Sequence, residues 1–387
     1  MYSPAVQELR AIERHLVEED LRDVLLLMKV MQSHHNGALY PFAIMGLIGL
    51  VVDEATRYVE SARAPSSRYP TAARMASAHA ANVTKARARI KLFDDSEGYA
   101  EGLVRALEVA RAKGVEWLNF KHRGLLSSWK RVVQPDLGVF WVGENLLATT
   151  HTALPSLGMT SSELESLMPI QMHKLGPQLR DYGQSVGSAI GQLSHELAAT
   201  GWMVAWNPSV PDDVGVRITH SNFIGAKFYS AAAAGLEPAE ERFLGSLILA
   251  IAQINTAIHL LPKLLDPNSN LLLRFQVLTT FHSMRMLQQA APHLMPDNGK
   301  VIAAEAQPRI SVAVRNLCGH YGLRSAARYA VGADDPLGAA IEGTDGIPRD
   351  VFQARIRQWL ALRSLNFAQC ISKGNMTQHR ALLGDHT

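Results

Sequence analysis

The segment near the C-terminus places residue types that can do chemistry on one helix face. Leu362, Asn366 and Cys370 are four residues apart in a stretch that begins like a helix at Arg349. Residues with this spacing are neighbours on a helix surface, so we expect their side chains to form one row. A polar amide and a lone thiol in an apolar row favour a binding site. The alternative is that Cys370 is a small buried hydrophobic residue, the common environment of a free cysteine.

The residues around this row resemble a known family. Leu362-Arg363-Ser364 resembles the Leu-Arg-Ser-aromatic-His helix of the tryptophan/indoleamine 2,3-dioxygenase superfamily, whose histidine binds haem iron. The row itself is similar to the His-x-x-x-Cys element of the 3-methyl-tyrosine hydroxylase branch (saframycin-type pathways). This resemblance implies a haem tethered to Cys370 through a thioether. It also shows a departure, because this chain has Asn366 where the family has its ligating histidine.

A second histidine is the implied iron ligand. His320 precedes Asn366 by 46 residues, a spacing broadly comparable to that of the second haem-ligating histidine in the same branch. Neutral imidazole is a natural axial donor to haem iron, and an amide is a poor one. The resemblance therefore implies that His320 is the metal ligand, with Asn366 across the iron or beside it. Cys318 is an alternative tether or thiolate ligand. The other interpretation of His320 is an ordinary histidine at a helix end.

The resemblance also implies roles for other residues. His282 or His34 would act as the catalytic acid or base. Arg363 or Arg324 would pair with a haem propionate or a substrate carboxylate, because a guanidinium can hold a carboxylate with two hydrogen bonds. A core position explains His282 equally well, and a helix cap or loop explains His34.

A shorter element extends the resemblance towards the middle of the chain. Trp206-Asn207-Pro208 is similar to an element of the pyrrolnitrin-pathway member of this superfamily. The resemblance then covers residues 200–372, and the first 200 residues resemble no family.

No other sequence motif supports a hydrolase, a zinc site or a nucleotide-binding site. Gly183-Gln184-Ser185-Val186-Gly187 fits the G-x-S-x-G pattern of a nucleophile elbow, which requires a strand before it and a helix after it. Helical sequence lies on both sides here, so we predict that these residues belong to a helix. Zinc-site, P-loop and dinucleotide-binding motifs are missing from the sequence.

Composition limits the class of protein. The chain has 387 residues, 47% hydrophobic and 19% charged, with a net charge of +3 and two cysteines. The small net charge predicts neither nucleic acid nor a membrane surface as partner. Two cysteines fit a reducing compartment. The apolar run 39–52 is too short to cross a bilayer. We predict a cytoplasmic protein.

Helical periodicity dominates the sequence, so we predict a mainly α fold, a multi-helix bundle with a helical haem-binding core towards the C-terminus. Residues 1–206 form the predicted N-terminal helical region and residues 207–387 the haem-binding region. A strand is expected only near 214–218, and residues 334–348 are expected to be a loop. The predicted helices are residues 9–28, 42–59, 72–90, 100–112, 160–199, 237–261, 268–290, 310–331 and 349–372.

Two functions follow as expectations. The resemblance implies a haem-dependent oxygenase or peroxygenase that hydroxylates a phenolic or indolic, amino-acid-derived substrate in secondary metabolism such as antibiotic biosynthesis. The alternative is a non-catalytic helical protein that binds a ligand or a partner and has lost the haem ligand at Asn366. A homodimer is left open.

Overall fold

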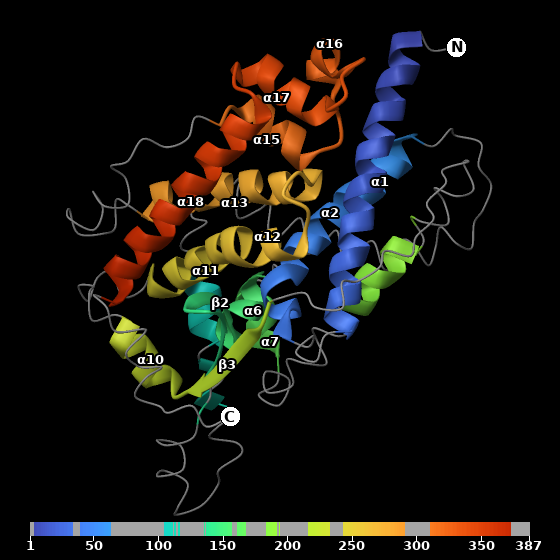
Figure 1. Cartoon of the computed structure of the whole chain (residues 1–387). Coiled ribbons are helices and arrows are strands. Elements are labelled where there is room, and N and C mark those ends of the chain that lie inside the picture. Colours follow the sequence, from blue (N-terminus) through green and yellow to red (C-terminus); the bar gives the residue numbers. More distant parts are fainter. Residues whose placement is uncertain are drawn as a thin grey trace, which may run out of the picture.

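The computed structural model describes residues 4–33, 39–62, 104–110, 112–113, 115–116, 135, 137–156, 161–167, 183–191, 193, 216–232, 243–290 and 310–372. Within these ranges the chain is mainly helical, which confirms the predicted fold class. One small antiparallel sheet lies against the helices (Figure 1).

Two long helices form the N-terminal part. They are α1 (Pro4–Ser33) and α2 (Pro41–Ala62). The predicted apolar stripe of α1 is buried, with Leu16 and Leu21 at most 1% exposed. α2 begins at Pro41, which suits a first helical turn because it has no amide hydrogen to leave unpaired. Just before it, the buried hydroxyl of Tyr40 donates a hydrogen bond to the Val216 carbonyl (3.0 Å). This bond ties the start of α2 to the segment that leads into the sheet.

The sheet has the strand order β2-β1-β3, with both pairs antiparallel. Its strands are β1 (Leu137–Val142), β2 (Asn145–Thr149) and β3 (Ile218–Phe223). Gly143, in the turn between β1 and β2, has a φ of +58°, which favours glycine. The hairpin is not predicted from the sequence because nearly all its residues are buried. The apolar–polar alternation of a half-exposed strand is therefore missing.

Three helices run through the centre of the molecule: α11 (Leu244–Asn255), α12 (Leu261–Leu264) and α13 (Asn270–Ala290). A five-residue π-helix, Thr256–Leu260, joins α11 to α12. The side chain of Asn255 donates to the Leu146 carbonyl of β2 (2.9 Å). Among the described helices, only the stretch Leu244–Leu264 has the length and composition of a membrane span, and 78% of its most apolar window is buried inside the protein. The core helix of a soluble protein passes the same test.

The C-terminal part is α15 (Val312–Gly319), a 3-10 turn (Arg324–Ala326), α16 (Ala327–Ala330), α17 (Pro336–Asp345) and α18 (Arg349–Ser372). α18 has the predicted bounds. The single helix expected over 310–331 is instead three short pieces.

The loop expected over 334–348 is wrong, because most of it is α17. The side chain of Asp335 caps the helix by accepting a hydrogen bond from the Gly338 amide (2.9 Å), and Pro336 begins the first turn. Gly346 ends the helix with a left-handed φ of +70°. The residues that suggest a loop are therefore the caps of a short helix.

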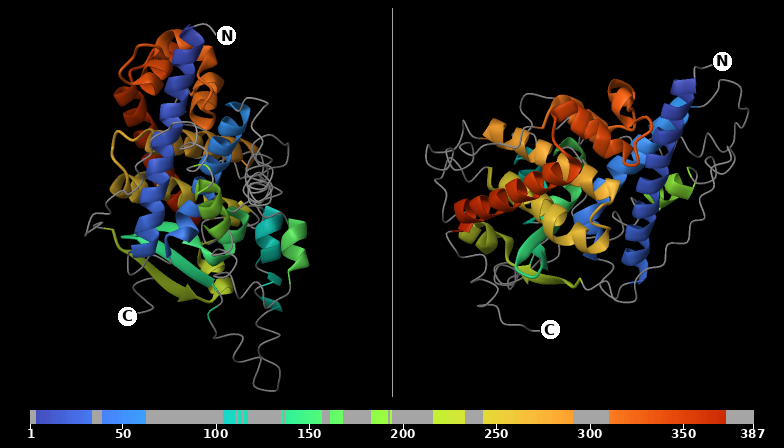
Figure 2. Two further views of the ribbon diagram at one scale, coloured as in Figure 1. Left: turned by 90° about the vertical axis from the view of Figure 1, so that its right-hand side faces the viewer. Right: turned by 45° about the horizontal axis from the view of Figure 1, so that its top comes forward.

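The remaining described helices include α6 (Thr150–Ser156), α7 (Ser161–Ser166) and α10 (Gly225–Ala232). Residues 183–191 are also helical, which confirms that the G-x-S-x-G sequence is not a nucleophile elbow. One core cluster draws on both of the predicted regions, since β1 precedes residue 206 and its partner β3 follows it. The sheet lies at the opposite end of the molecule from α15, α16 and α17 (Figure 2).

Candidate functional site

A small cavity lies where α2, α11 and α13 meet β2 and α6. Its volume is about 40 Å³. Most of the described residues that line it are Leu, Ala, Gly or Phe, and none of them is Lys, Arg, Asp or Glu. The polar side chains among them are Thr152, Gln253, Thr279 and His282. The described lining is therefore mainly apolar with a few hydrogen-bonding groups, which is the usual composition of a ligand pocket.

Helical spacing explains how the walls are built. On α2, Ala43, Gly46, Leu47 and Leu50 recur at the period of one helix face, and the two small residues leave room between the helices. Phe42 completes this wall, and its ring stacks on Phe140 of β1 at 4.3 Å between centroids.

The facing helices supply the polar groups. Thr279 and His282 are three residues apart on α13, and Leu249 and Gln253 are four apart on α11. Each pair lies on one face of its helix, and both faces border the cavity.

The Thr279 hydroxyl has no hydrogen-bond partner among the described residues, although Thr279 is only 4% exposed. Other helical threonines bond back to the carbonyl four residues earlier: Thr280 to Gln276 (2.7 Å) and Thr256 to Ala252 (2.8 Å). Thr279 makes no such bond. Its hydroxyl oxygen is itself buried, and the buried hydroxyls of Ser246 and Ser283 are in the same state, so this feature alone does not mark a ligand-binding group.

The other polar groups of the cavity are more exposed or already occupied. His282 and Gln253 are half-buried. The Thr152 hydroxyl donates to the Thr149 carbonyl (3.0 Å) and accepts from the Thr149 amide (2.9 Å), so it serves the turn after β2. Of the predicted catalytic residues, His282 thus lines a cavity, whereas His34 lies outside the described residues.

His320 lies elsewhere, at the end of α15 beside α2. Its Nδ1 is 2.7 Å from Oε1 of Glu54, and its side chain is 36% exposed. A carboxylate on one ring nitrogen fixes the orientation of the ring, an arrangement found in many metal-binding histidines. Glu54 could not be found from the sequence, because it is 266 residues away from His320.

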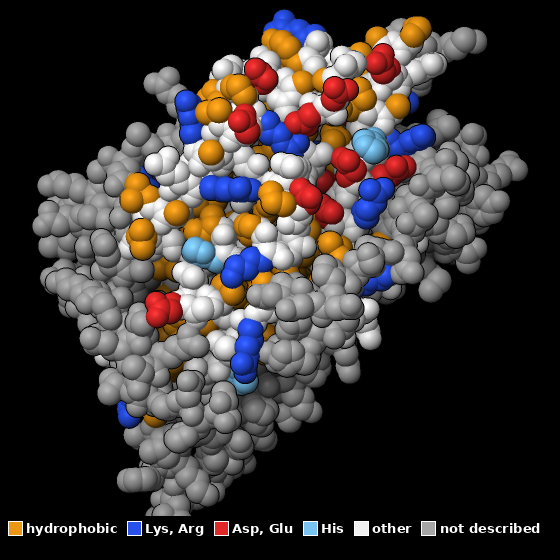
Figure 3. Space-filling view, in the orientation of Figure 1, with side chains coloured by type: hydrophobic (Ala, Val, Ile, Leu, Met, Phe, Trp, Pro, Cys, Tyr) orange, Lys and Arg blue, Asp and Glu red, His pale blue; other side chains and the backbone are white. Residues whose placement is uncertain are grey.

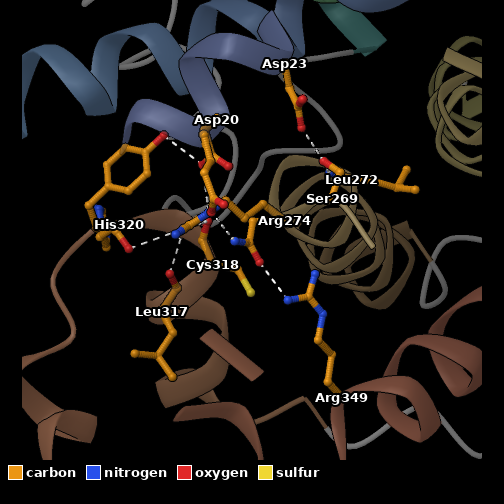
Figure 4. A network of polar contacts seen from close by, with 12 residues as sticks. Asp20, Asp23, Ser269, Leu272, Arg274, Leu317, Cys318, His320 and Arg349 are labelled. Atoms are coloured by element: carbon orange, nitrogen blue, oxygen red, sulfur yellow. Dashed lines mark hydrogen bonds and ion pairs between the residues drawn. The ribbon is translucent and has the colours of Figure 1, made fainter. Parts of the chain in front are cut away.

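Next to His320 is a buried network of polar groups (Figure 4). Nε of Arg274 on α13 is 2.9 Å from Oδ2 of Asp20 on α1, and the Tyr321 hydroxyl donates to the same oxygen at 2.9 Å. Nη1 of Arg274 also donates to the carbonyls of Leu317 (2.8 Å) and Cys318 (3.0 Å) at the end of α15. Burial lowers the pKa of Arg274, but Asp20 together with Tyr321, Cys318 and Glu54 outweighs this effect, so the pKa is raised. These contacts join three helices, so we interpret the network as structural.

Cys318 does not fit the predicted role of thiolate ligand. It is 2% exposed, and burial raises the pKa of its thiol to about 12. The thiol therefore stays protonated at neutral pH and behaves as a small core residue.

The structure does not gather the two predicted arginines around one ligand. Arg363 on α18 is fully buried, with its guanidinium 5.2 Å from the centre of the Trp359 ring. Arg324 is exposed in the 3-10 turn near Glu13. Neither of them lines the described cavity.

Asn366 and Cys370 lie on the second half of α18, and their side chains lie outside the described part of the structure. The start of this helix contacts α13, where Gln353 donates to Gln276 (3.1 Å). Cys370 is then about 25 Å further along the helix axis. Figure 1 shows α18 ending on the side away from α1 and α2, and His320 contacts Glu54 of α2. His320 and the backbone of Cys370 are thus not brought together.

These positions test whether haem fits. The imidazole of His320, oriented by Glu54, suits an axial ligand, but the end of α18 that carries Cys370 lies away from it. The cavity at His282 is far smaller than the several hundred Å³ of pockets for drug-sized ligands. Within the described residues, no three His, Cys, Asp or Glu side chains are placed to hold a metal ion. Haem binding at His320 therefore stays a prediction.

Comparison with known proteins adds no relative: no family model, curated protein or solved structure matches the chain. Surface charge gives little further guidance. On the face seen in Figure 3, the described Lys and Arg side chains are scattered among acidic ones. Any assignment must therefore rest on the geometry described above.

Proposed function

We propose that this protein binds a small molecule in the cavity between α2, α11 and α13. The observation that carries the proposal is the cavity itself, in which mainly Leu and Ala side chains surround a few polar residues, among them Gln253 and His282. A small bound molecule would cover the apolar side chains and would hydrogen-bond to the polar ones. This is the ligand-binding alternative of the sequence analysis.

The half-buried His282 suggests where chemistry would take place if the ligand is a substrate. It lies one turn along α13 from Thr279 and lines the same cavity, so a molecule bound there lies next to an imidazole. Imidazole is the side chain best suited to proton transfer near neutral pH.

Xenon tests the cavity without assuming a ligand. We expect xenon under pressure to shift the methyl resonances of Ala252, Leu278 and Thr279 in ¹H–¹³C spectra of the full chain. Ala43→Leu places three more carbon atoms into the cavity and should abolish these shifts. Ala361→Leu, at an exposed position of α18, is the matched control and should leave them unchanged. If xenon gives no shifts in the wild type, the cavity is closed and the proposal fails.

We also propose, as a second candidate, a haem-dependent oxygenase acting on a phenolic or indolic substrate. The observation that favours it is the 2.7 Å contact that holds the His320 ring against Glu54. His320 would bind the haem, which would supply the redox chemistry, and Glu54 would orient the imidazole.

The absorbance spectrum of protein made in haem-supplemented cells tests this candidate. A Soret band that His320→Ala removes supports it, whereas the exposed His15→Ala serves as the control and should keep the band. Haem that resists acid-acetone extraction in the wild type but not in Cys370→Ala would establish the tether. A colourless wild-type protein would remove this candidate and leave the cavity proposal untouched.

A further inference from the structure

A second candidate binding site lies on the surface, along the seam between α18 and the stretch formed by α11, the π-helix and α12. We propose that His259, Lys263 and Arg357, which border this seam, bind the phosphate group of a small molecule. None of the three lines the cavity at His282, so this site does not depend on the proposed function. Its support is the register of the helices, the position of Arg357 and the exposure of the seam.

Contacts at both ends of the seam fix how the helices lie. At one end, the Ser364 hydroxyl donates to Oδ1 of Asn255 (2.6 Å). At the other end, Gln353 and Arg357 each donate to the Pro267 carbonyl (3.4 Å). The chain direction of α18 is therefore opposite to that of α11 and α12, and Figure 1 shows α18 running beside them.

The three basic residues come to the same part of this seam. His259 and Lys263 follow Asn255 at intervals of four residues, so they continue its face of the helix. Lys263 is eight residues after Asn255, and Arg357 is seven residues before Ser364, so both are roughly 10–12 Å along the helix axis from that first contact. Lys263 and Arg357 therefore lie at about the same level. Burial and the nearby Lys263 both lower the pKa of His259, which agrees with this placement.

The π-helix has a physical cause that also positions Arg357. Each amide of a π-helix donates to the carbonyl five residues earlier, as happens at the end of this one. Pro262 has no amide hydrogen, so the Ala257 carbonyl needs another donor. Gln276 of α13 supplies it through Nε2 (3.2 Å), and its Oε1 accepts from Nε of Arg357 (3.4 Å). One side chain thus serves the π-helix and holds the guanidinium beside it.

The seam is open to solvent at this level. Lys263 is exposed, and His259 and Arg357 are half-buried. Ala361, one turn along α18 from Arg357, is exposed too, so other parts of the chain do not cover the seam there. Asp266 is the acid nearest to Lys263 in sequence, and its Oδ1 accepts from a backbone amide of its own turn (2.7 Å). A ligand can therefore reach the three basic groups from outside.

The chemistry of these groups suits phosphate. A guanidinium can give two parallel hydrogen bonds, an ammonium group gives a concentrated charge and an imidazole gives one N–H donor. A phosphate ester has three terminal oxygen atoms and two negative charges at pH 8, because its second pKa is about 6. It can therefore accept from all three side chains. A carboxylate has one charge and two oxygen atoms, so it would be bound less well.

Methyl phosphate and acetate are the probes, used at pH 8 and constant ionic strength. The readout is the imidazole Hε1–Cε1 resonance of His259 in ¹H–¹³C spectra of the full chain, assigned by its loss in His259→Gln. We expect methyl phosphate to shift this resonance saturably, with a Kd on the order of millimolar for so small a molecule. We expect acetate to bind about 10-fold more weakly.

Three charge-removing variants test the residues. Lys263→Gln and Arg357→Gln should each weaken methyl phosphate binding about 10-fold, the effect of losing one hydrogen bond to a charged group. Arg355→Gln is the matched control: it removes the same charge from an exposed position on nearly the opposite side of α18 and should leave binding unchanged. Because Lys263 is exposed, its variant tests the site even if Arg357→Gln disturbs the packing of α18.

Three results would overturn the proposal. The first is the lack of a saturable shift of His259 with methyl phosphate. The second is acetate binding as tight as that of methyl phosphate, which would show that the site does not recognise phosphate. The third is an equal loss of binding in Arg355→Gln and Lys263→Gln, which would mean a general attraction of anions to basic residues. None of these results changes the outcome of the xenon test of the cavity.

Discussion

The buried pair of Asp20 and Arg274 gives the protein an unusual dependence on pH. Asp20 is fully buried, and its Oδ1 has no hydrogen-bond partner among the described residues. Burial raises the pKa of this carboxyl from 3.8 to about 6, although Arg274 and Tyr321 act in the opposite direction. The perturbation that tests this balance is Asp20→Asn, which keeps the size of the side chain and removes its titration.

The sign of the effect follows from proton binding. A carboxyl whose pKa is higher in the folded than in the unfolded state holds its proton more tightly when folded. Its contribution to stability is therefore fully present below 3.8 and is lost as the pH rises through about 6. The shift is about 2 pKa units at roughly 1.4 kcal/mol each, so the free energy of unfolding changes by up to about 3 kcal/mol. The effect has the opposite sign to ordinary acid denaturation, in which the protein becomes less stable when its paired carboxylates are protonated.

The assay is urea unfolding of the wild type and Asp20→Asn between pH 7.5 and pH 4.5. We expect the wild type to gain about 2 kcal/mol relative to the variant over this range, with the steepest change near pH 5, between the pKa values of the unfolded and folded states. Asp334→Asn, at an exposed position, is the control and should show no comparable change. The reasoning is refuted if the difference in free energy of unfolding between the wild type and Asp20→Asn stays constant with pH, or if the wild type loses stability relative to the variant at low pH. It would mean that the attraction of Arg274 outweighs burial and keeps Asp20 charged.

Three further predictions concern single side chains. Thr279→Val should raise the free energy of unfolding by about 1 kcal/mol, because it removes a buried hydroxyl without a partner among the described residues. Thr280→Val should lower it by about 1 kcal/mol, because it removes the hydrogen bond to Gln276. Equal effects of the two variants in urea unfolding would contradict this. Asp335→Ala should destabilise the protein by about 1 kcal/mol through loss of the α17 cap, and Asp334→Ala should not; the same measurement checks both. Cys318 should resist iodoacetamide at pH 8 in the folded protein and react in urea, as followed by peptide mass spectrometry, because burial raises its pKa to about 12; labelling of the native protein would disprove it.

The sequence predicts those parts of the fold in which one helix face is buried. The apolar stripe of α1 and the bounds of α18 follow from periodicity and from the Pro348-Arg349 start. The hairpin and α17 do not. The hairpin strands are buried on both faces, which removes alternation, and α17 is so short that its cap residues outnumber its periodic ones.

The candidate site, too, is only partly predictable from the sequence. His282 is identified as a candidate from its residue type, and the structure places it at a cavity. Its partners in that cavity come from α2, α11 and β2, and no local pattern reports which helices meet. Thr279 could have been noticed as a polar residue one turn from His282, but Thr280 looks the same in sequence. Only the hydrogen bond to Gln276 separates the two.

Two adjacent turns of α13 differ in their polar surroundings. Arg274, near its start, is fixed by Asp20 and by the carbonyls at the end of α15. Thr279 follows five residues later, about 8 Å along the helix axis, and faces an uncharged cavity. A helix held by a buried ion pair cannot shift or rotate without leaving charges unpaired, which is costly. The charged groups therefore act as a rigid frame that fixes the position of α13 beside the cavity. The buried cluster with shifted pKa values thus holds the helices together, whereas the described lining of the candidate binding site contains no Lys, Arg, Asp or Glu.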